Sequence, residues 1–416
     1  MTGTLKNALV AGMLTAATAL ACAAGAREAA QTKPLLRAGD RMVSLGDSIT
    51  EQRIYTRYVM NYFTLRYPGA HVSFRNAGWG GDTAPGGLAR LERDVLSLKP
   101  TVVSICFGMN DGRYTAFDQA NYDQYMAGMH GLVSELKKAR VKVVLLTVGC
   151  VDPDRNAGLQ GYNDTLAALA KGVKELAVSE KLPVFDLHSL MLDVQTRAKK
   201  DDPGFTMIPD GVHPSQPGQA VMAYALLKAL GCSRQPSALW IRADKARAVP
   251  YGCKVRNLKV TKDLLSFTRT DSGLPTYFDP EADAVKKYLP LMRDFNQYRL
   301  RVTGLRAGTW KLVVEGIEVG AFTADELATG VDLGERAGPW RKLGQEVNAL
   351  SSEQENLYFH RWREVSLGPA PAGGQSELDA MLGVLDKALS DKEAERIRKA
   401  AENHVWKWTF TREVSQ

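Results

Sequence analysis

A serine stands where a short apolar run ends, in the stretch that reads MVSLGDSIT over residues 42–50. The residues from Arg53 to Leu65 have a helical pattern, so Ser48 lies where a strand passes into a helix. Such a position exposes the hydroxyl at the end of a strand, and backbone N–H groups of the next turn point at what it attacks. Ser48 is therefore a candidate nucleophile, although the same residues also suit a helix cap. Thr50 replaces the second glycine of a Gly-x-Ser-x-Gly elbow, so that motif is absent.

Three further clusters have compositions suited to catalysis. They are Asn76-Ala77-Gly78-Trp79-Gly80-Gly81-Asp82-Thr83, Gly108-Met109-Asn110-Asp111 and Asp210-Gly211-Val212-His213-Pro214. The glycines of the first cluster can present N–H groups to a ligand, and the amide of Asn110 can donate to a developing oxyanion. Asp210 can accept from one ring nitrogen of His213 and leave the other nitrogen as a base. Each cluster alone also fits a turn, a helix cap or a surface histidine. With Ser48, however, they supply every group that acyl transfer requires.

An alternation of strands and helices over residues 37–230 would bring these clusters together. Strand patterns cover residues 41–45, 71–76, 101–107, 141–148 and 182–187, and helical patterns cover 53–65, 86–98, 122–139, 162–179 and 215–230. Near-continuous apolar strands separated by helices indicate a parallel sheet that is covered on both faces. Ligands of such sheets bind outside the carboxyl ends of the strands, where Gly46, Asn76 and Gly108 stand.

At these residues the sequence resembles the SGNH family of hydrolases, also called GDSL-type esterases. The matching blocks are Gly46-Asp47-Ser48-Ile49-Thr50, Asn76-x-Gly78-x-x-Gly81-Asp82-Thr83, Gly108-x-Asn110-Asp111 and Asp210-x-x-His213-Pro214, which occur in the family's order. The resemblance covers about residues 40–230. It implies a flavodoxin-like, three-layer α/β/α fold with a parallel sheet, and a serine esterase that uses no metal or other cofactor.

The resemblance also assigns roles to residues. It makes Ser48 the nucleophile, His213 the base and Asp210 the partner of the base. The oxyanion hole would consist of the Ser48 N–H, the Gly81 N–H and the side chain of Asn110. Weaker candidates for substrate contact, each with an alternative role in core packing, helix capping or a solvated loop, are Asp47, Trp79, Met109, Asp111 and Arg113.

The pattern changes after residue 232, so we expect a catalytic domain at 37–232 and a smaller mixed α+β domain at 233–416. Antiparallel strand patterns cover residues 254–260, 298–305 and 310–315, helical patterns cover 340–355 and 376–402, and a late strand is expected at 405–410. Two aromatic clusters, His360-Arg361-Trp362-Arg363 and Trp406-Lys407-Trp408, can bind polysaccharide or pack between domains.

The first 26 residues predict an export signal. Lys6 precedes an apolar stretch, and Ala24-Gly25-Ala26 is a small-x-small cleavage site. Cys22 lies in a segment that resembles a lipobox with its leucine one place out of position, so a lipid anchor is an alternative to soluble export. In an exported protein Cys232 and Cys253 can form a disulfide. The sequence contains neither Cys-x-x-Cys nor His-Glu-x-x-His, and its charge of +7 is spread too thinly to indicate nucleic-acid binding.

These observations predict a periplasmic or secreted serine esterase whose substrate is a small-molecule or polysaccharide ester, with O-acetyl groups on a carbohydrate favoured. A lipase or lysophospholipase is the first alternative and would require a large apolar rim around Ser48. An alternative of another class is a carbohydrate-binding protein with a vestigial hydrolase domain. The pattern does not specify the oligomeric state.

Overall fold

The computed structural model describes residues 34–232, 236–369, 371–402 and 404–413. Its N-terminal part is built on a five-stranded parallel sheet in the order β2-β1-β3-β4-β5. The strands are β1 (Arg41–Gly46), β2 (Ser73–Gly78), β3 (Val102–Cys106), β4 (Lys142–Leu146) and β5 (Val184–Phe185). This order is that of flavodoxin-like folds, in which the order of the strands reverses between β1 and β3.

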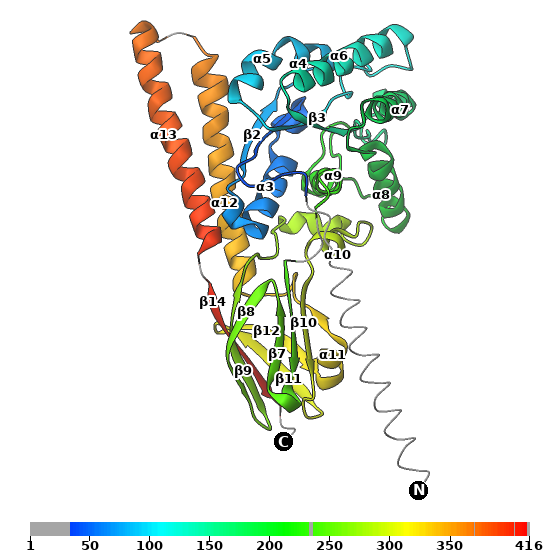
Figure 1. The fold of residues 1–416 in the computed structure, drawn as a ribbon. Coiled ribbons are helices and arrows are strands. Elements are labelled where there is room, and N and C mark those ends of the chain that lie inside the picture. Colours follow the sequence, from blue (N-terminus) through cyan, green and yellow to red (C-terminus); the bar gives the residue numbers. More distant parts are fainter. Residues whose placement is uncertain (1–33, 233–235, 370, 403, 414–416) are drawn as a thin grey trace.

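Helices cover both faces of this sheet (Figure 1). The N-terminal helices are α2 (Ser48–Glu51), α3 (Ile54–Arg66), α4 (Ala84–Ala89), α5 (Leu91–Asp94), α6 (Gln119–Lys138), α7 (Tyr162–Glu180), α8 (Leu187–Asp201) and α9 (Gln216–Ala229). Helix α3 packs on α9, while α6 contacts α4 and α7. The three-layer α/β/α fold expected from the sequence is therefore confirmed. In the described part of the chain, no helix is long and apolar enough to span a membrane.

Two helical regions of this part differ from their sequence patterns. The expected helix at 86–98 is divided into α4, α5 and a 3-10 turn, because Arg90 leaves the helical conformation and donates to the Gly46 carbonyl and to Asp82. Helix α8 was not predicted. The sequence nevertheless contains a helix signal here: Asp186 is a favourable N-cap residue, and apolar residues follow it with helical spacing. These residues, all buried, are Leu187, Met191, Val194 and Ala198.

The C-terminal part contains two further sheets, in the orders β13-β10-β6-β7 and β12-β11-β14-β9-β8. Their strands are β6 (Ser237–Arg242), β7 (Arg247–Tyr251), β8 (Cys253–Val260), β9 (Leu264–Asp271), β10 (Tyr298–Thr303), β11 (Thr309–Val314), β12 (Ile317–Thr323), β13 (Val331–Asp332) and β14 (Val405–Arg412). The short helices α10 (Leu291–Phe295) and α11 (Ala324–Thr329) accompany them. These sheets share a second core and form a separate domain, in which Trp310, Trp340 and Trp408 are buried.

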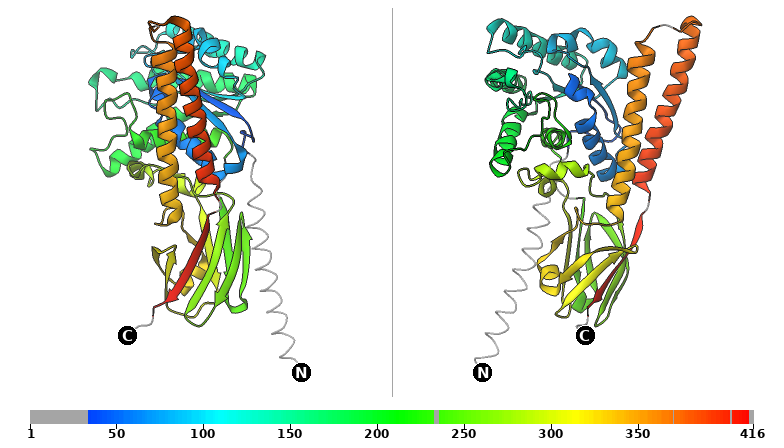
Figure 2. Two further views of the ribbon diagram at one scale, coloured as in Figure 1. Left: turned by 90° about the vertical axis from the view of Figure 1, so that its left-hand side faces the viewer. Right: turned by 180° about the vertical axis from the view of Figure 1, so that it is seen from behind.

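Two long helices leave the C-terminal sheets and run along the α/β domain (Figure 2). They are α12 (Pro339–Phe359) and α13 (Gly374–Ala401), which form an antiparallel hairpin, and α12 continues into a π-helical turn, η6 (His360–Ser366). Helix α12 packs on α3, and Trp362 and Leu389 of the hairpin belong to the core of the α/β domain. Part of the C-terminal sequence is therefore structurally an outer layer of the N-terminal domain.

The predictions for the cysteines, the two aromatic clusters and the export signal have different outcomes. Cys232 and Cys253 are free thiols, so the disulfide considered between them is absent. Trp362, Trp406 and Trp408 are buried, so the two aromatic clusters serve packing. The predicted export signal at 1–26, including Cys22, lies outside the described residues. The predicted domain boundary at residue 232 is followed by residues 233–235, which also lie outside the described residues.

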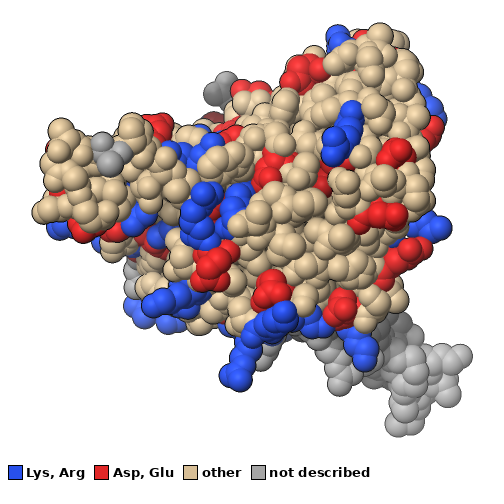
Figure 3. Space-filling view, turned by 90° about the horizontal axis from the view of Figure 1, so that it is seen from above, with Lys and Arg blue, Asp and Glu red and all other residues tan. Residues whose placement is uncertain are grey.

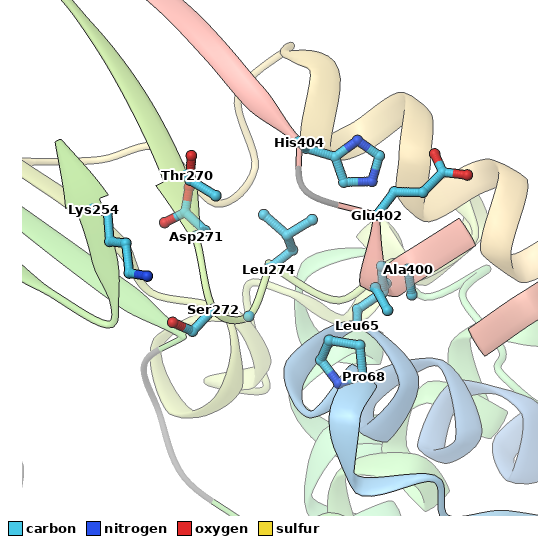
Figure 4. Close-up of a pocket in the computed structure, with 12 residues that line it drawn as sticks. Leu65, Pro68, Lys254, Thr270, Asp271, Ser272, Leu274, Ala400, Glu402 and His404 are labelled. Carbon is cyan, nitrogen blue, oxygen red and sulfur yellow. The ribbon is translucent and has the colours of Figure 1, made fainter. Parts of the chain in front are cut away.

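A cavity of about 210 Å³ lies where the C-terminal sheets meet the α/β domain. Figure 4 shows Lys254 and Asp271 from β8 and β9 on one side of it, with Leu65 of α3 and His404, just before β14, on others. None of the residues proposed for catalysis lines this cavity.

The C-terminal core should depend strongly on Trp408, whose ring stacks on Trp340 and Phe267 with centroids 5.6 and 5.7 Å away. Trp408→Ala should lower the free energy of unfolding by about 3–5 kcal/mol, since it removes a large buried ring and leaves a cavity. Trp408→Phe is the matched control and should cost less, because it keeps an aromatic ring in the stack. Denaturant titration measures both, and equal stability of the two variants would contradict this account of the core.

Candidate active site

Ser48 is the first residue of α2, directly beyond the end of β1. The Asp47 side chain caps this turn by accepting a hydrogen bond of 3.0 Å from the Ile49 N–H. The chain can turn here only because residue 46 is glycine. A Cβ at Gly46 would lie 2.2 Å from the Thr50 hydroxyl oxygen and 2.7 Å from the Cys106 carbonyl oxygen. The Gly-Asp-Ser sequence thus produces a sharp turn that leaves Ser48 half-buried at the edge of the sheet.

His213 reaches Ser48 from a loop 165 residues further along the chain, with its Nε2 2.9 Å from the serine Oγ. Its Nδ1 lies 2.7 Å from Asp210 Oδ2. A carboxylate can only accept, so Nδ1 carries the proton that is donated to Asp210, and Nε2 is left to accept from the Ser48 hydroxyl. The geometry is that of a nucleophile, a base and a group that orients the base.

The loop that carries His213 is held by the carboxylate of Asp210. In addition to the hydrogen bond from the His213 ring, Asp210 accepts backbone hydrogen bonds of 2.7 Å from the His213 N–H and 2.9 Å from the Val212 N–H. Partial burial acts to raise the pKa of Asp210, but the hydrogen bonds from His213 and Val212 outweigh it and hold the pKa below its ordinary value. Asp210 is therefore ionised at neutral pH and can stabilise a protonated imidazole.

Gln219 joins the histidine side of the site to the serine side. This buried glutamine of α9 accepts from the Tyr55 N–H at 3.0 Å and donates to the Ile49 carbonyl at 3.3 Å. It thereby fixes the start of α9, which follows His213, against the turn that carries Ser48. Gln219 was not among the predicted site residues, because a lone glutamine on an apolar helix belongs to no motif that would predict its partners.

The loop after β2 carries the glycines predicted to face an oxyanion. Gly80 and Gly81 are exposed, whereas Asn76 is buried. The Asn76 amide donates to the Thr50 carbonyl at 2.8 Å and accepts from the Gly78 N–H at 2.9 Å. Asn76 therefore clamps this loop against the helix that begins at Ser48, and Gly81 stands at the same end of the sheet as Ser48.

Asn110 follows β3, which pairs with β1 on the side opposite to β2, and completes the predicted group of donors. Its Nδ2 donates to the Asp82 carbonyl at 2.9 Å, and its Oδ1 accepts from the Tyr114 hydroxyl at 2.8 Å. An amide nitrogen carries two hydrogens, so the bond to Asp82 leaves a second N–H for an oxyanion. The two hydrogen bonds also fix which way the amide faces.

From the sequence, Tyr114 could be expected to touch substrate or to lie in a solvated loop, and its contact with Asn110 was not predicted. It follows Arg113 in a turn where both residues have left-handed backbone conformations, with φ of 55° and 58°, a strained arrangement typical of functional sites. Its ring packs on Tyr162 with centroids 5.1 Å apart. Burial raises the pKa of Tyr114 to about 12, so the hydroxyl remains a hydrogen-bond donor to Asn110 at neutral pH.

Three of the weaker substrate-binding candidates lie beneath the site. Asp47, Met109 and Asp111 are 3%, 1% and 6% exposed. Asp111 accepts from the Ala84 N–H at 2.9 Å, while Asp47 caps the Ser48 turn. Burial raises the pKa of Asp47 and of Asp111 to about 7. These contacts fit the alternative roles in capping and core packing, and such buried side chains offer little surface to a substrate.

The other two weaker candidates are more accessible. Trp79 is half-buried and packs edge-on against Trp362 of the hairpin, with centroids 5.9 Å apart. Arg113 is exposed, and its guanidinium lies 3.5 Å from the Gln124 side chain. The structure thus gives Trp79 a partner in the C-terminal sequence and leaves Arg113 at the surface.

Residues 44–221 match the GDSL-like Lipase/Acylhydrolase family. This match begins within β1, ends within α9 and includes Ser48, Gly81, Asn110, Asp210 and His213. This part of the chain belongs to that family, and the protein is a hydrolase that acts on ester bonds.

Known proteins resemble this chain in sequence and in fold. An acetylxylan esterase of Geobacillus stearothermophilus is 26% identical over 232 residues, which cover 49% of this chain and 97% of the relative. Among solved structures, a gut microbial diltiazem-metabolizing enzyme shares the fold with a TM-score of 0.80 and 23% identity, over 92% of this chain and all of the other. A structure of a catalytic mutant of an acetylxylan esterase from Geobacillus stearothermophilus aligns over 48% of this chain and 97% of its own, at a TM-score of 0.41 and 24% identity.

The contact between Tyr114 and Asn110 predicts a specific kinetic defect. Tyr114→Phe removes the hydroxyl that holds the Asn110 amide, so ester hydrolysis should lose about tenfold in kcat with KM nearly unchanged. Asn110→Ala, which removes the donor itself, should lose on the order of 100- to 1000-fold. Steady-state kinetics on p-nitrophenyl acetate measure both variants. Full kcat in Tyr114→Phe would show that the amide needs no such support.

Proposed function

We propose that this protein is an exported serine esterase that removes O-acetyl groups from a carbohydrate through an acyl-enzyme intermediate. The observation that carries the catalytic part is the chain of contacts from Ser48 Oγ to His213 Nε2, at 2.9 Å, and from His213 Nδ1 to Asp210, at 2.7 Å. These distances are within the range required of a serine that is activated by a base.

The first half of the proposed reaction forms the acyl-enzyme. His213 takes the proton of Ser48 as Oγ attacks the ester carbonyl carbon, and the carbonyl oxygen becomes an oxyanion. The N–H groups of Ser48 and Gly81 and the amide of Asn110 stabilise that charge. The bond to the alcohol oxygen then breaks, and His213 gives its proton to the departing alcohol.

The second half releases the acid and restores the enzyme. Water loses a proton to His213 as its oxygen attacks the acyl carbon, and a second oxyanion forms in the same place. The bond to Ser48 Oγ breaks, and the serine recovers its proton from His213. Asp210 keeps the imidazole in the required tautomer and balances its positive charge in both halves.

The carbohydrate part of the proposal is supported by the relative named acetylxylan esterase, at 26% identity over nearly all of its length. Export is part of the proposal and rests on the signal-like sequence of residues 1–26, with a lipid anchor at Cys22 as the alternative. On the face seen in Figure 3, acidic and basic side chains are interspersed over the end of the hairpin and the neighbouring helices. A mixed surface of this kind suits a neutral substrate better than a polyanion.

The catalytic proposal predicts a nearly complete loss in Ser48→Ala. This variant should lose ester hydrolysis by several orders of magnitude while it retains the circular dichroism spectrum and melting temperature of the parent, because Ser48 is only half-buried. Ser179→Ala, on the last turns of α7, is the control and should keep full activity. Parental activity in Ser48→Ala would end the proposal, whereas absence of esterase activity in the parent itself would favour a vestigial hydrolase domain.

The substrate proposal predicts a strong preference for short acyl groups. Hydrolysis of p-nitrophenyl acetate should exceed that of the butyrate, and the palmitate should react least. Acetate should also be released from acetylated xylan, as measured by chromatography of the products. Preference for the palmitate ester would favour a lipase. Preference for the acetate ester, with no acetate released from acetylated xylan, would show that the natural substrate is an acetate ester of another alcohol.

A further inference from the structure

The π-helical turn η6, at the tip of α12, lies against the turn that begins at Ser48 and against the loop after β2 that contains Trp79, Gly80 and Gly81, hereafter the oxyanion loop. Arg363 of η6 forms an ion pair of 2.6 Å with Glu51. Its guanidinium carbon also lies 3.5 Å from the centre of the Trp79 ring. Both charged side chains are about a fifth exposed, so this contact is largely shielded from solvent. π-helical turns are uncommon and occur frequently at functional sites.

Both partners of Arg363 are directly connected to groups that the reaction uses. Glu51 ends α2, the four-residue turn that Ser48 begins. Trp79 lies two residues before Gly81 in the oxyanion loop. The second carboxylate oxygen of Glu51 faces that loop closely, since a Cβ on Gly80 would lie 2.9 Å from it. One guanidinium therefore contacts the turn behind the nucleophile and the loop with the oxyanion N–H.

Other contacts enclose the Trp79 ring and leave it little freedom. The guanidinium groups of Arg90 and Arg93 lie 5.7 and 5.5 Å from its centre. Arg90 also donates to the Gly46 carbonyl at 3.1 Å, and Trp362 Nε1 donates to Asp94 at 3.1 Å. The oxyanion loop is thus packed between the α/β domain and the hairpin.

We propose that Arg363 is a positioning residue for the oxyanion hole, and that the hairpin completes the active site which the α/β domain begins. This inference rests on the proposed serine mechanism. The acetylxylan esterase is matched over 97% of its own length by only 49% of this chain, so about half of this chain has no counterpart there. The C-terminal sequence would therefore supply the loop with a support from outside the part of the chain that the family model matches.

The chemistry of the contact requires arginine rather than a cation in general. A guanidinium is planar, so it can lie on the indole face of Trp79 while its edge binds the carboxylate of Glu51. A lysine ammonium at position 363 can pair with Glu51 but has no flat surface for the ring. Arg363→Lys should consequently recover only part of what Arg363→Met loses.

The test compares Arg363→Met with a variant of the same segment. Arg361 lies two residues away and binds Asp386 of α13 through hydrogen bonds of 2.6 and 2.9 Å, so Arg361→Met loosens the hairpin without touching the oxyanion loop. Arg363→Met should lower kcat for p-nitrophenyl acetate by about 10- to 100-fold, with KM changed less than twofold. Its affinity for phenylboronic acid, which forms a tetrahedral adduct on serine, should fall in parallel.

The remaining variants separate positioning from stability. Arg361→Met should keep parental kcat even if its melting temperature falls as far as that of Arg363→Met. Glu51→Gln combined with Arg363→Met should be little worse than Arg363→Met alone, because both act through one contact. Parental kcat in Arg363→Met, or an equal loss of kcat in Arg361→Met, would overturn the inference. Both outcomes leave the serine mechanism intact, because that mechanism fails only if Ser48→Ala is active.

Discussion

The hydrogen bond between His213 and Ser48 imposes the constraint that the rest of the fold meets. The two residues are 165 positions apart, yet their side-chain atoms must lie 2.9 Å apart. A parallel sheet solves this problem because the carboxyl ends of its strands lie along one edge. Strand β1 lies between β2 and β3, so the segments that carry Ser48, Gly81 and Asn110 are neighbours. Gln219 then ties α9, and with it the histidine loop, to the serine turn.

Polar side chains beneath and around this edge maintain the geometry of the donors. Asn76 clamps the oxyanion loop to the turn that Ser48 begins, and Tyr114 orients the amide of Asn110. Burial raises the pKa of Asp47 and of Asp111 to about 7, so the floor of the site carries less negative charge at neutral pH than two ordinary carboxylates would. The hairpin adds Arg363 to the same set of supports from outside.

The sequence predicts the sheet well and the supports poorly. Five apolar runs fall on β1 to β5, and the four motif blocks fall on the loops that follow strands or precede α9, because periodicity and turn residues act locally. The same periodicity predicts α12 and α13 but not what they pack against. An amphipathic pattern shows that a helix buries one face, and the partner of that face is decided by tertiary contacts. The ion pair between Glu51 and Arg363, whose partners are 312 residues apart, leaves no local signal of its own.

The most direct measurement of the central claim is covalent labelling of the nucleophile. A fluorophosphonate reacts with a serine hydroxyl only where a neighbouring base and oxyanion donors activate it. Mass spectrometry of the digested protein should find one adduct, on the peptide that contains Ser48, and its formation should parallel the loss of esterase activity. The label should be absent from His213→Ala under the same conditions. An adduct on another serine, or equal labelling of Ser48 without the imidazole, would contradict the account.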